Sequence, residues 1–185
     1  MKVLKFGGTS VASAKNIRLV RDIVAARAGK EQLFIVVSAF SQVTNKLQSI
    51  VDESVDNNVA ARKTLVQIKK QHYAATEELL NKKESKAVLK SLDTILANIE
   101  KLVEGVGIIG EMTPRINDRI MSMGERLSST IIGSYFNQEF KTETINPGDY
   151  ILTDSNYGKA NVNYKVTYEN IAKAKFPKRT VILSP

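Results

Sequence analysis

Residues 2–37, KVLKFGGTSVASAKNIRLVRDIVAARAGKEQLFIVV, decide the fold class of this chain. Residues 2–6 are short, rich in apolar and aromatic residues, and followed by Gly7-Gly8, which predicts a buried strand ending in a tight turn. Residues 33–37 form a continuous apolar run, typical of a strand that is covered on both faces.

A helix is predicted between these two strands. Ser10 or Ser13 can cap its N-terminus, and Gly29 stands where a helix C-terminal glycine belongs. Apolar residues recur at helical spacing between them: Val11, Ala14, Ile17, Val20 and Val24. Strand, helix and strand in under forty residues make a βαβ unit, whose crossover requires parallel strands and is almost always right-handed. The sequence therefore predicts an α/β layered fold.

Helices dominate the middle of the chain and strands return near its end. Residues 44–83 favour a helix with a break near 56–58, and its apolar stripe comprises Val43, Leu47, Ile50 and Val51. Residues 85–103 favour a second helix that ends at Gly105 and forms a helical hairpin with the first. Thr113-Pro114 predicts the start of a helix that continues to about residue 136. Strands are predicted over residues 140–145, 151–153 and 180–183, with turns at 146–148 and 156–158.

Composition excludes several classes of protein. The chain has 185 residues, no cysteine and one histidine, His72, so disulfide scaffolds, thiol catalysis and His-rich zinc sites are ruled out. One domain is expected at this length. The sequence has no apolar run of about 18 residues and no signal-peptide pattern, so we expect a cytoplasmic protein without a membrane partner.

The charge balance permits an anionic partner. Lys and Arg number 27 against 19 Asp and Glu, which gives a net charge of +8. A basic nucleic-acid-binding module is the alternative from another class, and its candidate residues near the end of the chain are Lys165, Lys173, Lys175, Lys178 and Arg179. These cations have acidic neighbours and no recognised binding motif, which favours a solvated face and no nucleic-acid partner.

Two glycine patterns require different readings. Gly105, Gly107 and Gly110 match the spacing of a dinucleotide fingerprint, but a helix and not a strand precedes them, and Glu111 stands where a P-loop needs lysine. We interpret residues 105–110 as a loop between helices.

The stretch Lys5-Phe-Gly7-Gly8-Thr9-Ser10 carries the stronger signal. It lies at the end of the first strand, where glycine amides, a helix N-terminus and a lysine can together form a phosphate cradle. A glycine turn beside a solvated lysine has the same spacing, and spacing alone does not separate the two. Ser38 to Thr44 follows the neighbouring strand, and parallel strands end at one edge, so both loops are expected to face a common crevice.

A third element surrounds Gly124. Glycine inside a helix costs about 1 kcal/mol against alanine, so Gly124 suggests the close approach of another group. Glu125 and Arg126 form either an exposed pair or, if Glu125 faces the crevice, a carboxylate suited to a substrate ammonium.

Taken in order, these motifs resemble those of aspartokinases, members of the amino acid kinase family, and the resemblance covers essentially the whole chain. The matching residues are Lys5 to Val11, Val37 to Ala39 with Val43 to Asn45, Gly124-Glu125 with Ser128, and Thr153-Asp154 with Tyr157, Gly158, Ala160 and Val162. The resemblance implies a three-layer αβα sandwich with a mainly parallel sheet. It also implies ATP-dependent phosphorylation of the side-chain carboxylate of L-aspartate to 4-phospho-L-aspartate, the first step toward Lys, Thr and Met.

The resemblance also implies roles for individual residues. Lys5 corresponds to the lysine that stabilises the transferring phosphoryl group, and Gly7, Gly8, Thr9 and Ser10 to the phosphate loop. Ser38 and Thr44 correspond to hydroxyls that contact aspartate, and Glu125 to the carboxylate near its amino group. ATP and Mg²⁺ are the implied cofactors, but no residue is assigned to the metal, and residues 153–162 receive no firm role.

We expect the implied domain to be incomplete. Because the chain stops at Ser184-Pro185, directly after an apolar strand, we expect residues 1–185 to be the N-terminal, aspartate-side portion, truncated at the C-terminus. The nucleotide-binding half and any regulatory domains would then be absent, and the piece inactive alone. A homo-oligomer is expected for the full-length protein. An alternative to a catalytic role is a piece that acts only as an oligomer-forming or packing element of a larger chain, with the helical hairpin as its contact surface. Acetylglutamate, glutamate or nucleoside-monophosphate kinases remain alternatives within the family.

Overall fold

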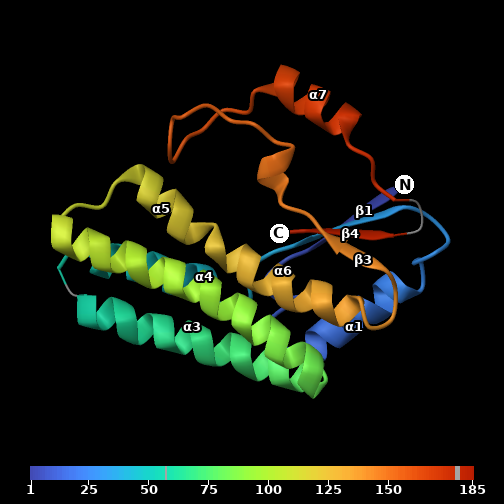
Figure 1. The fold of residues 1–185 in the computed structure, drawn as a ribbon, viewed down its shortest axis with the longest axis horizontal. Helices are drawn as coiled ribbons and strands as arrows, with labels where there is room; N and C mark the ends of the chain where they lie inside the picture. The colour runs from blue at the N-terminus through green and yellow to red at the C-terminus, as the bar shows by residue number, and fades with distance from the viewer. Residues whose placement is uncertain (57, 178–179) are drawn as a thin grey trace.

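Four parallel strands form the sheet at the centre of the protein. The computed structural model describes residues 1–56, 58–177 and 180–185, and its strands are β1 (Lys2–Phe6), β2 (Leu33–Val37), β3 (Thr142–Thr144) and β4 (Val181–Ser184). Their order is β1-β2-β4-β3, and every neighbouring pair is parallel (Figure 1). The predicted α/β class with a parallel sheet is confirmed.

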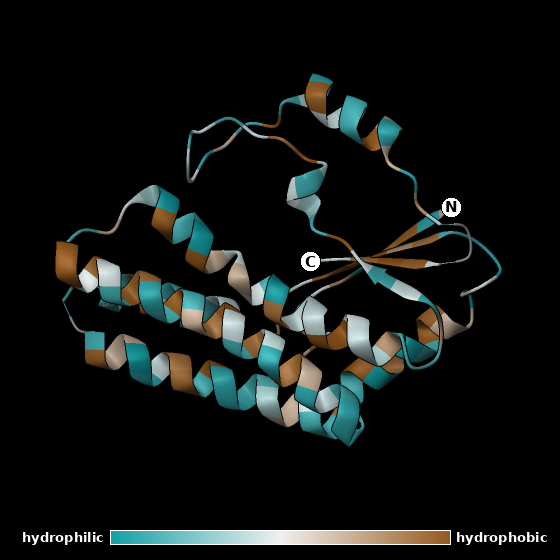
Figure 2. Cartoon of the chain, viewed as in Figure 1, coloured by the Kyte–Doolittle hydropathy of each residue, from teal (hydrophilic) through white to brown (hydrophobic). Residues whose placement is uncertain are grey.

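The sheet separates two unequal layers. Leu33, Ile35 and Val37 point into the main core, which the helices cover, whereas Phe34 and Val36 point to the opposite face. That second face is partly covered by the segment near the end of the chain, where the Phe176 ring packs edge-on against Phe34 with centroids 5.0 Å apart. Figure 2 shows apolar residues along β1 and β4, whereas β3 at the edge of the sheet is hydrophilic.

Helix α1 (Ala14–Ala25) follows the glycine turn. Ser13 caps it by accepting a hydrogen bond from the Asn16 amide, 3.3 Å away, so Ser13 and not Ser10 is the cap. The prediction that the helix runs to Gly29 is wrong. The chain leaves the helix after Ala25 in turns that bond back to the Val24 carbonyl, and Gly29 adopts its φ of +77° within this turn.

Helices α2 (Val43–Glu53), α3 (Asn58–Leu79) and α4 (Lys82–Ile109) confirm the long helical region and the hairpin. The prediction that α4 ends at Gly105 and continues as a loop is wrong, because the helix extends to Ile109 and ends at Gly110, whose φ is +76°. Burial of Val106 holds this extra turn against the core. Gly107 lets the turn pass close to α3, since a Cβ there would collide with the Asn58 amide.

The single helix predicted from residue 114 to 136 is two helices, α5 (Pro114–Met121) and α6 (Met123–Phe136). Thr113 caps α5 as predicted, accepting from the Ile116 amide at 3.3 Å. The helices separate at Ser122, whose hydroxyl donates to the Arg119 carbonyl at 2.9 Å. A serine that bonds the preceding turn competes with the helical ladder, which explains the interruption.

The last part of the chain differs most from the sequence predictions. The strand predicted over 140–145 shortens to β3, and residues 151–153 form no strand, only a bridge between Thr153 and Val162. The turn at 146–148 contains a 3-10 helix, η1 (Pro147–Asp149). Helix α7 (Tyr164–Lys173), which the sequence pattern did not predict, carries Lys165 and Lys173 at exposed positions. Lys178 and Arg179 lie outside the described residues. No helix in the described part of the chain is long and apolar enough to cross a membrane.

Candidate functional site

The glycine turn after β1 lies directly against the loop after β2. The Ser38 amide donates to the Phe6 carbonyl at 3.1 Å, continuing the strand pairing beyond the sheet. A Cβ at Gly8 would lie 3.1 Å from the Ala39 carbonyl oxygen, so the two loops meet where Gly8 has no side chain. Both loops therefore lie at one edge of the sheet, while the common crevice between them stays a prediction.

Backbone donors are open within the turn. The Ser10 amide donates to the Gly7 carbonyl at 2.9 Å, and the Asn16 side chain donates to the Thr9 carbonyl at 2.8 Å. These bonds fix the turn without engaging the Gly8 and Thr9 amides, which have no acceptor among residues 1–56, 58–177 and 180–185. Free amides at the end of a strand suit an anion such as a phosphate.

Lys5 contributes a full positive charge beside this turn. Leu4 and Phe6 pack against the main core, so alternation along β1 directs the exposed Lys5 to the opposite face. Lys5 pairs with Val36 of β2, and Val36 pairs with Ser184 of β4, which places Lys5 near the end of the central strands. Among the described carboxylates none forms an ion pair with Lys5, and its ammonium is available to a ligand.

Helix α6 joins the same edge through its first two turns. The Ser128 hydroxyl donates to the Ser38 carbonyl at 2.8 Å. A Cβ at Gly124 would lie 3.1 Å from the Ala39 Cβ and 3.0 Å from Leu47, which confirms the close approach predicted for this glycine. Half-buried Glu125 lines a cavity of about 380 Å³ with Arg126, residues 146–148 and Pro185. Glu125 therefore faces a cavity at the carboxyl end of β4.

Thr44 is the predicted residue that the structure integrates least. It lies exposed in the first turn of α2, and no hydrogen bond in the described chain joins it to the glycine turn or to Glu125. Its position is set indirectly, because the Val43 amide donates to the Phe40 carbonyl at 3.0 Å and Gln42 adopts a φ of +66°.

The residues 153–162, which the sequence left without a role, form a hairpin that closes on α5. Asp154 accepts bonds from the side chain and amide of Asn161 and from the Asn156 amide, and these bonds lower the pKa of Asp154. The Gly158 amide donates to Asp118 of α5 at 2.7 Å. The turn signal at residues 156–158 identified the bend, but its partner forty residues earlier has no local signature.

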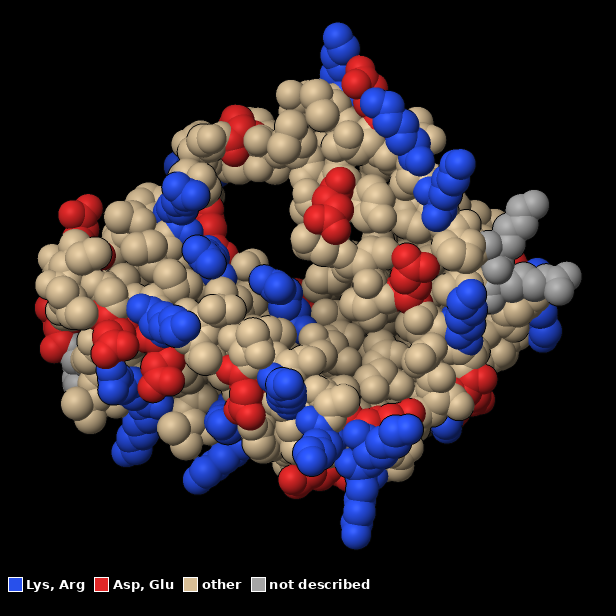
Figure 3. All heavy atoms as spheres, viewed as in Figure 1, with Lys and Arg blue, Asp and Glu red and all other residues tan. Residues whose placement is uncertain are grey.

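The hairpin bounds an opening in the molecular surface. Figure 3 shows this opening between α5–α6 and the segment that follows η1, with basic side chains on the α5–α6 side. The exposed cations of these two helices are Arg115, Arg119 and Arg126. Arg115 lies over the Tyr157 ring of the hairpin, 5.5 Å from its centroid. Acidic side chains border the opening as well, so it presents charges of both signs.

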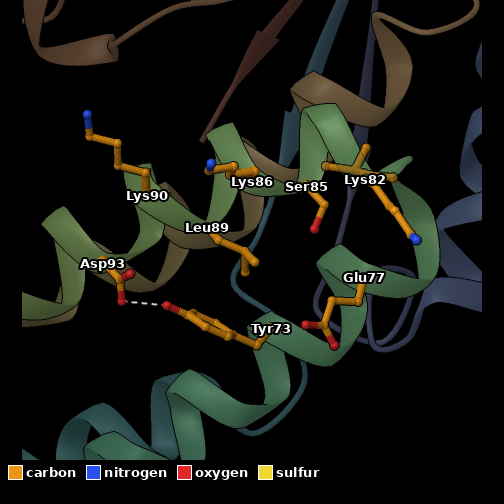
Figure 4. Close-up of a pocket in the computed structure, with 9 residues that line it drawn as sticks. Tyr73, Glu77, Lys82, Ser85, Lys86, Leu89, Lys90 and Asp93 are labelled. Carbon is orange, nitrogen blue, oxygen red and sulfur yellow. Dashed lines mark hydrogen bonds between the residues drawn. The ribbon is translucent and has the colours of Figure 1, made fainter.

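A second, larger cavity lies elsewhere, between α3 and α4. It has a volume of about 630 Å³ and is lined by Tyr73, Lys86 and Asp93, among others (Figure 4). Asp93 is already bonded to Lys69 at 2.7 Å and to the Tyr73 hydroxyl, and the Lys69 bond lowers the Asp93 pKa. None of the predicted site residues lines this cavity, so it is not the candidate site.

Among the described residues no three His, Cys, Asp or Glu side chains gather at one point, and no residue is assigned to the implied Mg²⁺. The glycine turn, by contrast, fits the phosphates of ATP, because open amides and an unpaired lysine lie together at one strand end.

Comparison with known proteins yields one family and a consistent set of relatives. The model of the amino acid kinase family matches residues 1–185. The chain is 33% identical over 138 residues to aspartokinase 1 of Arabidopsis thaliana chloroplasts, covering 73% of this chain and 23% of that protein. It is 31% identical over 159 residues to the aspartokinase of Chlamydia trachomatis, covering 85% and 33%. The chain thus spans a quarter to a third of these relatives.

Solved structures share the fold. Escherichia coli aspartokinase III in complex with aspartate and ADP matches with a TM-score of 0.84 and 24% identity, over 98% of this chain and 40% of that one. The same enzyme in complex with lysine and aspartate matches with a TM-score of 0.86 and 23% identity, again over 98% and 40%.

Proposed function

Because residues 1–185 belong to the amino acid kinase family, we propose that they form the aspartate-side portion of an aspartate kinase domain. The reaction transfers the γ-phosphoryl group of ATP to the side-chain carboxylate of L-aspartate and gives 4-phospho-L-aspartate. One observation carries the proposal: the glycine turn, the Ser38 loop and the start of α6 meet at one sheet edge. The curated relatives named aspartokinase support the choice of acceptor.

The chemistry suits the residues present. A carboxylate acceptor is ionised at neutral pH, so the reaction needs neither a general base nor a covalent intermediate on the protein. Its main requirement is to bring two anions together. In our proposal Lys5 neutralises the transferring phosphoryl group, while the open amides of Gly8 and Thr9, with Gly7 and Ser10 in the same turn, hold phosphate oxygens. Losing one such donor typically costs about 3 kcal/mol in the barrier.

The acceptor is recognised by a second group of residues in this proposal. Glu125 faces its cavity from the first turn of α6 and receives the substrate ammonium. Ser38 and Thr44 contact the amino acid through their hydroxyls. An acceptor whose nitrogen is acylated has no ammonium for Glu125, and this separates aspartate from acetylglutamate.

The test compares acceptors directly. The protein that contains these residues is incubated with ATP, Mg²⁺ and either L-aspartate, N-acetylglutamate, glutamate or UMP, and ADP release is measured. Hydroxylamine is included with the amino acids to trap an acyl phosphate as its hydroxamate. We expect turnover with L-aspartate to exceed that with every other acceptor. Preferential turnover of another acceptor, or none with aspartate, would refute the proposal.

A further inference from the structure

A side chain of α3 forms a hydrogen bond to the loop that carries Ser38 and leads to Thr44. Gln71 lies 30 residues after Ser41 and 25 after Lys46, and its side-chain amide reaches both. The amide nitrogen donates to the Ser41 carbonyl at 3.2 Å. The amide oxygen accepts from the Lys46 ammonium at 3.1 Å.

The two residues bonded to Gln71 lie on either side of Thr44 along the chain. Ser41 precedes Thr44 by three residues in the loop, and Lys46 follows it by two in α2. The orientation of the Gln71 amide is fixed chemically, because a carbonyl needs a donor and an ammonium needs an acceptor. One side chain therefore bridges the loop and the helix on either side of the residue that would contact the acceptor.

The next residue of α3 supports the same loop. His72 is fully buried and stacks on Phe40, with ring centroids 4.7 Å apart and an angle of 3° between the rings. Its Nδ1 donates to the Ile68 carbonyl at 2.8 Å, which fixes the ring plane. Nε2 is buried without a partner among the described residues. Phe40 and Ser41 are thus anchored by consecutive residues of one helix.

We propose that Gln71 is a positioning residue for acceptor binding, which it serves by holding the segment from Ser41 to Lys46 in place. The inference rests on the proposed function, because it assumes that this segment contacts the acceptor. In this role Gln71 acts through its bonds to Ser41 and Lys46. Its removal should weaken acceptor binding while leaving the phosphate-binding turn, which is held by other bonds, unchanged.

The test uses Gln71→Met, which keeps the length of the side chain and removes both hydrogen bonds. Lys46→Met removes one bond and leaves the Ser41 contact. Gln67→Met, one turn earlier on α3, is the matched control, because Gln67 is exposed and has no side-chain hydrogen bond within the described residues. Each variant is made in the protein that contains these residues, and KM for aspartate, KM for ATP and kcat are measured.

Two lost hydrogen bonds should raise the KM for aspartate about five- to tenfold in Gln71→Met, and less in Lys46→Met. The KM for ATP should change less than about twofold, and Gln67→Met should match the wild type. A purely structural role would instead lower thermal stability without separating the two KM values. Equal KM values for aspartate in Gln71→Met and Gln67→Met would overturn the inference.

A second readout separates this inference from the proposed function. Backbone hydrogen exchange of residues 41–46 should accelerate in Gln71→Met and remain unchanged in Gln67→Met, whichever acceptor the enzyme uses. If the wild type fails to phosphorylate aspartate, the proposed function fails, while faster exchange still supports the inference that Gln71 holds residues 41–46 in place. Unchanged exchange in Gln71→Met overturns the positioning inference by itself.

Discussion

Replacing Gly124 by alanine tests the contact of α6 with Ala39, in the loop after β2, and with the start of α2. A Cβ at this position would lie 3.1 Å from the Ala39 Cβ, 3.0 Å from Leu47 and 3.4 Å from Val43. These three neighbours are all buried. The Leu47 methyl group can rotate, but the Ala39 Cβ moves only with its backbone, so α6 and the loop must separate by a few tenths of an ångström.

The expected change in the free energy of unfolding results from two opposing effects. Overpacking a core costs about 1–3 kcal/mol. Alanine gains up to about 1 kcal/mol over glycine in a helix interior, and less here, because Gly124 is the second residue of α6. We predict that Gly124→Ala lowers the free energy of unfolding by about 1–2 kcal/mol. Gly105 in α4 is the matched control, since a Cβ there meets no atom within 4 Å.

The assay is a urea unfolding titration that is monitored by circular dichroism. Gly105→Ala should stabilise the protein by up to about 1 kcal/mol, so the two variants should differ by about 2 kcal/mol. At this chain length that difference corresponds to roughly 4–8 °C in Tm. If Gly124→Ala proves as stable as Gly105→Ala, α6 does not pack against Ala39 as closely as the Gly124 geometry requires.

Further predictions concern a buried ring, the ammonium site and the hairpin. Burial lowers the pKa of His72 to about 4, and the nearby Lys46 ammonium adds to the shift. Between about pH 6.5 and 4 the imidazole is therefore protonated more readily in the unfolded chain than in the folded protein. The free energy of unfolding should therefore fall by about 3 kcal/mol as the pH falls through this window, and His72→Phe, compared by urea unfolding at each pH, should remove that slope. Glu125→Gln should raise the KM for aspartate at least about tenfold in steady-state assays, while an unchanged value would exclude ammonium binding there. Asp118→Ala should release the Gly158 amide and accelerate limited proteolysis within the exposed hairpin of residues 153–162. Cleavage at the wild-type rate would show that the bond from Gly158 to Asp118 does not hold the hairpin in place.

The sequence predicts the parallel sheet well because the signals for β1, α1 and β2 are local and contiguous. The contact between Gly8 and Ala39 was also foreseeable, since neighbouring parallel strands end at one edge. The end of α4 was not, because Gly105 has the local chemistry of a helix stop while burial of Val106 extends the helix. Tertiary packing overrides propensity in such cases.

Long-range bonds account for what the sequence did not reveal of the site. The bond from Gln71 to Ser41 depends on the rotation of α3 about its axis, which is set by the packing of that helix. The bond from Gly158 to Asp118 likewise joins segments forty residues apart. The sequence around Gln71 and around Asp118 has no pattern from which their bonding partners could be predicted.

Lys5→Ala provides the most direct test of the central claim that the glycine turn and its lysine serve phosphoryl transfer to aspartate. The measurement is aspartate-dependent hydroxamate formation with ATP, using the protein that contains these residues, alongside a thermal unfolding curve. We expect the variant to lose turnover while its Tm stays near that of the wild type. An Lys5→Ala variant that forms aspartyl hydroxamate at the wild-type rate would contradict it.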